Sequence, residues 1–174
     1  MSATVTNPAV AAEIEILREQ AKAIHRVLRL NTDGLTQEDS LLQPDRGGNC
    51  LNWVVGHLLQ TYDGAVLPTL GEAPVLGKEA LARYDRGTPA LRDPAEALAL
   101  SDLLAAWDEA AKRVDAGLAR LSSERLDQPA PFSPRNNPHE TVRSLLTIVM
   151  FHQAYHAGQA GLLRRMAGKE GAIR

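Results

Sequence analysis

The chain of 174 residues has one cysteine, few aromatic residues and no long apolar run. Cys50 has no second cysteine to pair with, so internal disulfides are excluded. No apolar run approaches the roughly 20 residues of a membrane-spanning helix. The first residues offer neither the basic start nor the apolar core of a secretory signal. We therefore expect a cytoplasmic protein with no membrane partner.

The sequence also lacks an excess of charge of either sign. Its 19 Lys and Arg residues nearly balance 21 Asp and Glu residues, and the formal net charge is -2. A nucleic-acid-binding surface needs clustered basic residues that neutralise phosphates, and the sequence has no such cluster. Nucleic acid is therefore not an expected partner.

The scarcity of aromatic residues bears on the fold. They make up 4% of the chain, whereas apolar residues as a whole make up 44%. The core must then consist mainly of Leu, Ala, Val and Ile, and this composition favours helices over a β-sandwich. A length of 174 residues fits one domain with a substantial core, so we expect a single domain over residues 1–174.

Apolar residues recur at intervals of three and four in four segments, which predicts four helices. We expect the first helix to begin at the cap Asn7 and to stop before Gly34. The second is expected from Asn49 until Pro68 stops it. The third is expected from the capping box at Asp93 to about residue 121.

The fourth helix is expected from Asn137, or one turn later from Thr141, to about residue 167. Residues 36–48 are expected to form a connection. Residues 69–92 form a longer one, with a short helix at 78–84, and exceed an ordinary helix–helix loop. The predicted fold is therefore all-α: a four-helix bundle with a long crossover between the second and third helices.

Two histidines, His152 and His156, stand four residues apart within the fourth predicted helix. Positions i and i+4 lie on one face of a helix, so both imidazoles can reach one metal ion. His57, in the second predicted helix, is the best candidate for a third ligand. We therefore predict a divalent metal ion held by three histidines: zinc or nickel, with iron or manganese as further candidates.

The alternative is that these histidines are core residues with hydrogen-bond partners. Burying three imidazoles without a common partner is costly, which favours the metal site. The other two histidines are assigned elsewhere: His25 is expected to pack beside the first helical stripe, and His139 to lie on the surface.

Several side chains are predicted around the three histidines. His57 shares a helical face with Trp53, Gln60 and Thr61. Gln159 lies one turn beyond His156 and either orients a ligand or is a polar core residue. Gln153 stands where the zinc-peptidase motif has its glutamate, and because it cannot act as a base, that activity is excluded.

Three stretches of this sequence resemble the DinB family, the DNA-damage-inducible-like bundles that include the YfiT-like metal-dependent hydrolases. They are residues 49–57, 152–159 and 162–169. The resemblance implies a four-helix bundle in up-down-down-up order and a divalent metal on His57, His152 and His156. It also implies a homodimer and, as in some relatives, a low-molecular-weight thiol or another small molecule as substrate.

The expected function is that of a metal-dependent enzyme, a hydrolase or a thiol S-transferase, in which the metal acts as a Lewis acid. The alternative is a non-catalytic metal-binding bundle that serves a stress response or binds a small ligand. A haem or other cofactor bundle is a third possibility, supported only by the histidines themselves.

Overall fold

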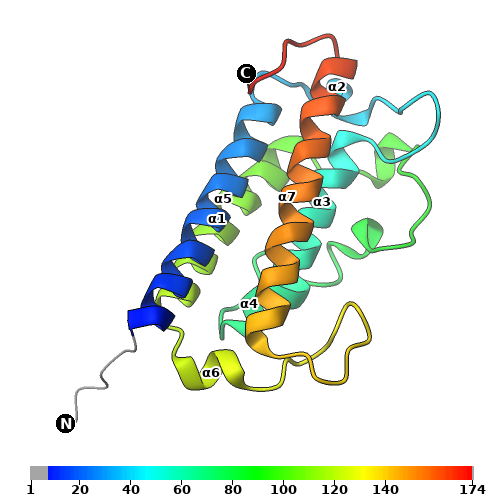
Figure 1. The fold of residues 1–174 in the computed structure, drawn as a ribbon. Coiled ribbons are helices and arrows are strands. Elements are labelled where there is room, and N and C mark those ends of the chain that lie inside the picture. The colour runs from blue at the N-terminus through cyan, green and yellow to red at the C-terminus, as the bar shows by residue number, and fades with distance from the viewer. Residues whose placement is uncertain (1–7, 174) are drawn as a thin grey trace.

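The structure is a computed structural model that describes residues 8–173 (Figure 1). Four helices of bundle length form an all-α domain: α1 (Pro8–Thr32), α3 (Leu51–Thr61), α5 (Leu100–Ala119) and α7 (Val142–Met166). Shorter elements connect them: α2 (Gln37–Leu41), π-helical η1 (Tyr62–Val66), α4 (Leu67–Thr69), the 3₁₀ turns η2 (Ala82–Tyr84) and η3 (Pro94–Glu96), and α6 (Ser123–Asp127). The predicted fold class is confirmed.

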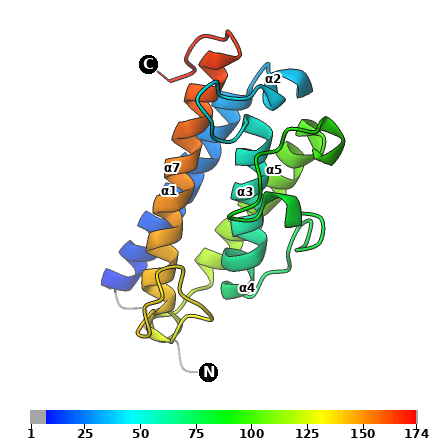
Figure 2. The ribbon, with the colours of Figure 1, turned by 90° about the vertical axis from the view of Figure 1, so that its right-hand side faces the viewer.

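The four long helices are arranged as a square. The first, α1, packs against α5 and α7, and α3 packs against the same two helices from the opposite side. In Figure 1, α1 and α7 rise while α3 and α5 descend, which is the up-down-down-up order that the family resemblance implies. Because α3 and α5 run the same way, the chain must return from one end of the bundle to the other between them. Figure 2 shows this return on the outer side of α3.

Burial of one apolar stripe per helix holds the bundle together. On α1 the stripe includes Ile14, Leu17, Ile24 and Leu28, all buried. Each such side chain contributes roughly 1.5–3 kcal/mol relative to full exposure. The aliphatic core predicted from the composition is present, and the few aromatics are concentrated inside it: Trp107, Tyr62 and Tyr84 are fully buried.

The first half of the chain departs from the expected helix ends in three places. The predicted cap Asn7 lies outside the described residues. Residues 36–48 are not only a connection, because Thr36 and Asp39 form a capping box that starts α2. The predicted cap Asn49 is wrong: α3 is preceded by Cys50, whose side chain makes no capping hydrogen bond with any described residue.

The second helix does not stop at Pro68, and that prediction is wrong as well. The chain continues through the π-helical turn η1 into α4, where Pro68 occupies the first turn. An amide hydrogen is not needed at that position, so the proline is tolerated. The π-helical turn directly follows Thr61, the last residue of α3.

The third helix begins at Leu100, seven residues later than predicted from Asp93. Asp93 instead caps the 3₁₀ turn η3 by accepting a hydrogen bond from the amide of Ala95. The chain after it is held extended, because the Tyr84 hydroxyl accepts from the Leu98 amide and the Asn52 side chain donates to the Leu98 carbonyl. Long-range contacts therefore override the local capping signal.

The remaining elements follow the sequence more closely. Of the two predicted starts of the fourth helix, the later one is correct, because Thr141 and Ser144 form a capping box. The short helix expected at 78–84 is reduced to η2, and α6, capped by Ser122, was not expected. Within residues 8–173, no helix combines the length and apolar character that crossing a membrane requires.

One carboxylate anchors the crossover to the end of α3. Asp63 accepts three backbone hydrogen bonds, at 2.9, 2.7 and 2.9 Å, from the amides of Val75, Leu76 and Gly77. The crossover is thus bound to η1 within the described part of the chain, and Asp63 is used there rather than at the histidines.

A second carboxylate, Glu140, organises the loop before α7. It accepts hydrogen bonds from Ser144, from Ser133 at 2.7 Å and from Arg135 at 2.7 Å. These donors, Ser144 foremost, lower the pKa of the Glu140 carboxyl from its ordinary 4.5 to about 2. A depressed pKa in the folded state means that the carboxylate stabilises the fold above the unfolded pKa, and that this contribution is lost as the pH falls toward 2.

We predict that Glu140→Gln lowers the midpoint of urea unfolding at neutral pH, and that its difference from the wild type shrinks as the pH falls from about 5 toward 2. The control is Glu38→Gln, at an exposed position in the first turn of α2. A deficit in Glu140→Gln that is constant over this pH range would contradict the assignment.

Candidate metal site

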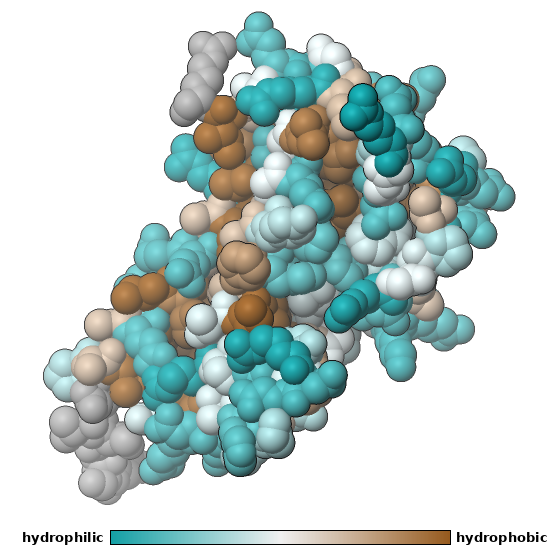
Figure 3. Space-filling model, turned by 45° about the vertical axis from the view of Figure 1, so that its right-hand side comes forward, coloured by the Kyte–Doolittle hydropathy of each residue, from teal (hydrophilic) through white to brown (hydrophobic). Residues whose placement is uncertain are grey.

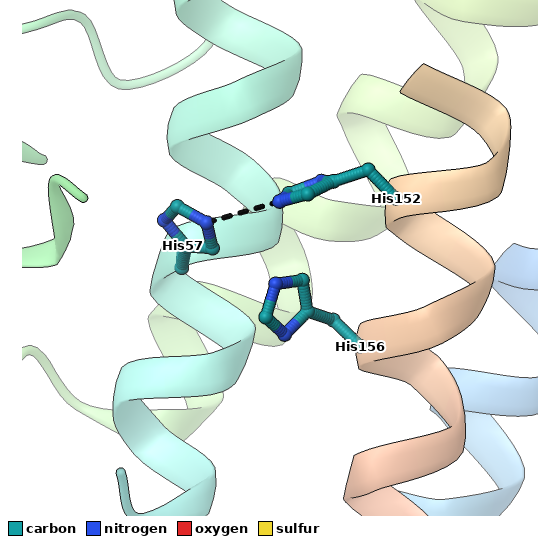
Figure 4. A group of neighbouring side chains, drawn as sticks. All are labelled: His57, His152 and His156. Carbon is teal, nitrogen blue, oxygen red and sulfur yellow. Dashed lines mark hydrogen bonds between the residues drawn. The ribbon is translucent and has the colours of Figure 1, made fainter. Parts of the chain in front are cut away.

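Three imidazole rings meet between α3 and α7. His57 projects from α3, and His152 and His156 project from successive turns of α7 toward it (Figure 4). One ring nitrogen of each residue lies within 4.8 Å of the others. The structure therefore brings together the three residues that the sequence singled out from positions up to 99 residues apart.

The ring of His57 is fixed by its surroundings. Its Nδ1 lies 2.9 Å from the backbone carbonyl oxygen of Tyr84, which can only accept a hydrogen bond, so Nδ1 carries the proton. The indole of Trp53 stacks on the ring, with centroids 4.6 Å apart, and its Nε1 donates to the Thr88 hydroxyl. In the neutral ring Nε2 is then left with a lone pair that faces the other two histidines.

His156 is oriented in a comparable way. Its Nδ1 lies 2.7 Å from Oε1 of Gln159, one turn further along α7. With the side-chain oxygen accepting, Nδ1 donates, and Nε2 keeps its lone pair for the space between the rings. Gln159 was predicted either to orient a ligand or to be a polar core residue, and this contact supports the orienting role.

His152 completes the group. Its Nε2 lies 3.2 Å from Nε2 of His57, and among the described residues its buried Nδ1 has no hydrogen-bond partner. Two nitrogens bound to one tetrahedral zinc ion at about 2.0–2.1 Å would be about 3.3 Å apart, so the observed spacing fits the donor set of such a site. The His57–His152 pair thus already has the spacing of two ligands of one ion, and the ligand nitrogen of His156 lies within 4.8 Å of both.

All three histidines are disposed to be neutral at ordinary pH. Burial lowers the pKa of His57 and of His156. Burial also lowers the pKa of His152, to about 4, with additional contributions from the positive charges that His156 and His57 would carry. A neutral imidazole is the form that binds a metal ion, so no proton has to be displaced near pH 7.

The histidines form one wall of a cleft of about 1040 Å³. All four predicted pocket residues, Trp53, Gln60, Thr61 and Gln159, line this cleft as well. Thr61 is bonded to its own helix, since its hydroxyl donates to the His57 carbonyl at 3.0 Å. The two outlying histidines lie elsewhere: His25 stacks on Trp107 and contacts Asp108, and His139 is exposed.

A comparison with sequence profiles of known families matches most of the chain. The sequence profile of the DinB superfamily matches residues 8–160, which include all three histidines. The chain belongs to the DinB superfamily.

A solved structure with a similar fold supports this assignment of the bundle. It is the crystal structure of a conserved protein from Enterococcus faecalis, 17% identical, with a TM-score of 0.68 over 89% of this chain and 97% of that chain. At this identity the similarity shows the fold alone. No curated protein matches the chain.

Sequence reasoning missed the part of the crossover that closes over His57 in this DinB-superfamily bundle. The Tyr84 carbonyl, the Thr88 hydroxyl and the Arg86 side chain all lie at or near the cleft. They follow no helical period, so spacing gave no signal. Gln153 proved to have a structural role, since it is fully buried and its amide donates to the Leu58 carbonyl at 3.0 Å.

Gly56 allows this part of the crossover to approach α3. A Cβ atom on Gly56 would lie 2.1 Å from the Tyr84 ring, so only glycine lets that ring lie against the helix. The position of the ring in turn places the Tyr84 carbonyl beside His57, the next residue of α3.

We predict that Gly56→Ala lowers the free energy of unfolding by about 1–3 kcal/mol because Tyr84 is displaced. The matched control is Gly158→Ala on α7, where an added Cβ meets no described atom within 4 Å. Its replacement should be neutral or stabilising by up to about 1 kcal/mol, since alanine favours helix. Urea denaturation measures both, and equal stabilities of the two variants would refute the packing role of Gly56.

Proposed function

We propose that this protein is a metal-dependent enzyme, of the hydrolase or thiol S-transferase type, with His57, His152 and His156 as the metal ligands. The convergence of three imidazole nitrogens at the wall of a large cleft is the observation that carries the proposal. When bound, a divalent cation would supply Lewis-acid chemistry at that wall.

The chain's own groups have separate tasks in this proposal. The Tyr84 carbonyl and Gln159 hold the imidazoles of His57 and His156 with their Nε2 atoms toward the centre. Three protein ligands are typical of catalytic sites, whereas structural zinc sites have four. The open side of the ligand set would face the cleft, where a substrate can enter.

The chemistry of the lining favours thiol transfer over hydrolysis. Among the described residues that line the cleft there is no Asp or Glu, so the chain presents no carboxylate as a general base for a water molecule. A thiol ionises more readily than water and depends less on such a base. The three-nitrogen donor set suits zinc or nickel, and iron as well, better than manganese, which prefers oxygen ligands.

The ligand assignment predicts that His156→Ala loses both the bound metal and the stabilisation that added zinc gives. Elemental analysis and thermal melts with and without chelator measure these effects. The control is His139→Ala, at an exposed position before α7, which should keep the metal content of the wild type. Full metal content in His156→Ala would show that the assignment is wrong.

A non-catalytic binding protein is the alternative, and the largely apolar lining of the cleft is compatible with it. Only the enzyme would convert a substrate into product. A screen of low-molecular-weight thiols with electrophilic acceptors, run with the metal-loaded protein and with His156→Ala, separates them: product formation that depends on His156 indicates an enzyme.

We also propose a cytoplasmic location, with which the buried free thiol of Cys50 is compatible.

We also propose that the protein forms a homodimer, as the family resemblance implies. Two large apolar side chains on α1 support this: Ile16 is 60% exposed and Leu30 is 39% exposed. The two positions are fourteen residues apart and so lie on the same side of α1, the side that would face the second subunit.

The dimer proposal predicts that Ile16→Glu dissociates the dimer without changing the melting temperature of the isolated subunit. Size-exclusion chromatography with light scattering measures the mass. The control is Leu42→Glu, at an apolar position that is similarly exposed but lies in the loop after α2. A wild-type protein that is monomeric at all concentrations tested would refute the dimer.

A further inference from the structure

The charge inside the cleft is unbalanced. Two cationic side chains, Arg86 and Arg135, line it, and no carboxylate does so among the described residues. Arg135 is already paired, because its guanidinium donates to the Glu140 carboxylate at 2.7 Å. Arg86 is therefore the one positive charge of the described lining that is left for a ligand.

Arg86 lines the same cleft as the histidines, and its guanidinium has no partner among residues 8–173. It lies two residues after Tyr84, whose carbonyl contacts His57, and it is exposed. Within the described part of the chain its guanidinium makes neither an ion pair nor a hydrogen bond. Arg86 and His152 both line the cleft.

The opposite wall is apolar and comes from α7. Ile148, Phe151, Tyr155, Leu162 and Met166 recur at helical intervals and line the cleft. Phe151 is 67% exposed and Leu162 is 61% exposed. In Figure 3, patches of apolar surface lie along this face of the molecule, interspersed with hydrophilic surface. Apolar side chains gathered along one wall of a cleft are typical of a ligand-binding site.

We propose that the cleft binds an organic monocarboxylate with an apolar body, with its carboxylate on Arg86 and its body on the α7 stripe. This deepens the proposed function, on which it rests for the reaction at the histidines. The substrate would be an amphipathic acid held between the guanidinium and the apolar wall, with its reactive centre beside the imidazoles.

A carboxylate fits this site better than a phosphate does. One unpaired guanidinium presents a planar fork that matches a carboxylate with two parallel hydrogen bonds. A phosphate ester carries up to two negative charges, and phosphate sites usually combine several cationic or amide donors. The described lining offers a single unpaired cation, which balances one negative charge.

The test uses the full-length, metal-depleted protein, so that it does not depend on the metal proposal. Isothermal titration calorimetry at neutral pH compares phenylbutyrate with its neutral amide, phenylbutanamide, and with phenyl phosphate. We expect the carboxylate to bind the wild type at least about tenfold more tightly than the amide, as for a hydrogen bond to a charged group, and more tightly than phenyl phosphate. Equal binding of acid and amide, or tighter binding of phenyl phosphate, overturns the proposal.

Variants then assign the effect to Arg86. Arg86→Gln should weaken phenylbutyrate binding about tenfold and leave phenylbutanamide binding unchanged. Arg86→Lys, which keeps the charge and loses the fork, should fall between the two. The control Arg26→Gln, at an exposed position on α1 outside the cleft, should match the wild type.

Wild-type affinity of Arg86→Gln for phenylbutyrate would refute the assignment. If Arg86→Gln binds phenylbutyrate like the wild type while His156→Ala still loses its metal, only the proposed substrate class is refuted. The reverse result, in which Arg86 recognises the acid but no metal binds, refutes only the metal-dependent function.

Discussion

The contact between the Tyr84 carbonyl and Nδ1 of His57 is the interaction on which the site depends most. It joins the crossover, which follows no helical period, to a helix that supplies one of three converging imidazoles. By placing the proton of His57 on Nδ1, it leaves the Nε2 lone pair of this buried residue directed at the rings from α7. Without a hydrogen-bond acceptor at that point, either ring nitrogen of His57 could carry the proton, and its Nε2 lone pair would not be directed at the rings from α7.

Much of the architecture could be predicted because it depends on period and composition. The stripes of α1, α5 and α7 repeat at helical intervals, and a core poor in aromatics suits helices. The spacing of His152 and His156 is itself a helical feature, so that half of the site follows from local geometry. His57 could be predicted because it is a polar residue within a helix that is otherwise largely apolar.

The rest depends on contacts between distant segments, which local patterns do not encode. Asp93 and Pro94 give a strong signal for a helix start, yet Tyr84 and Asn52 hold Leu98 extended, and the helix starts later. Arg86 was missed for a related reason. A single arginine in a loop carries no pattern, and its position beside the histidines is set by the fold of the crossover.

Hydrogen bonds hold the crossover at two points. Asp63 accepts from the backbone of its first part, and His57 and Trp53 donate to its later part. Between these points lie Lys78, Glu79 and Ala80, all exposed. Exposed turns bounded by fixed neighbours are where inserted sequence is best tolerated. A reporter peptide or a tether to a solid support, placed at residues 78–80, would leave both sets of hydrogen bonds and the imidazoles undisturbed.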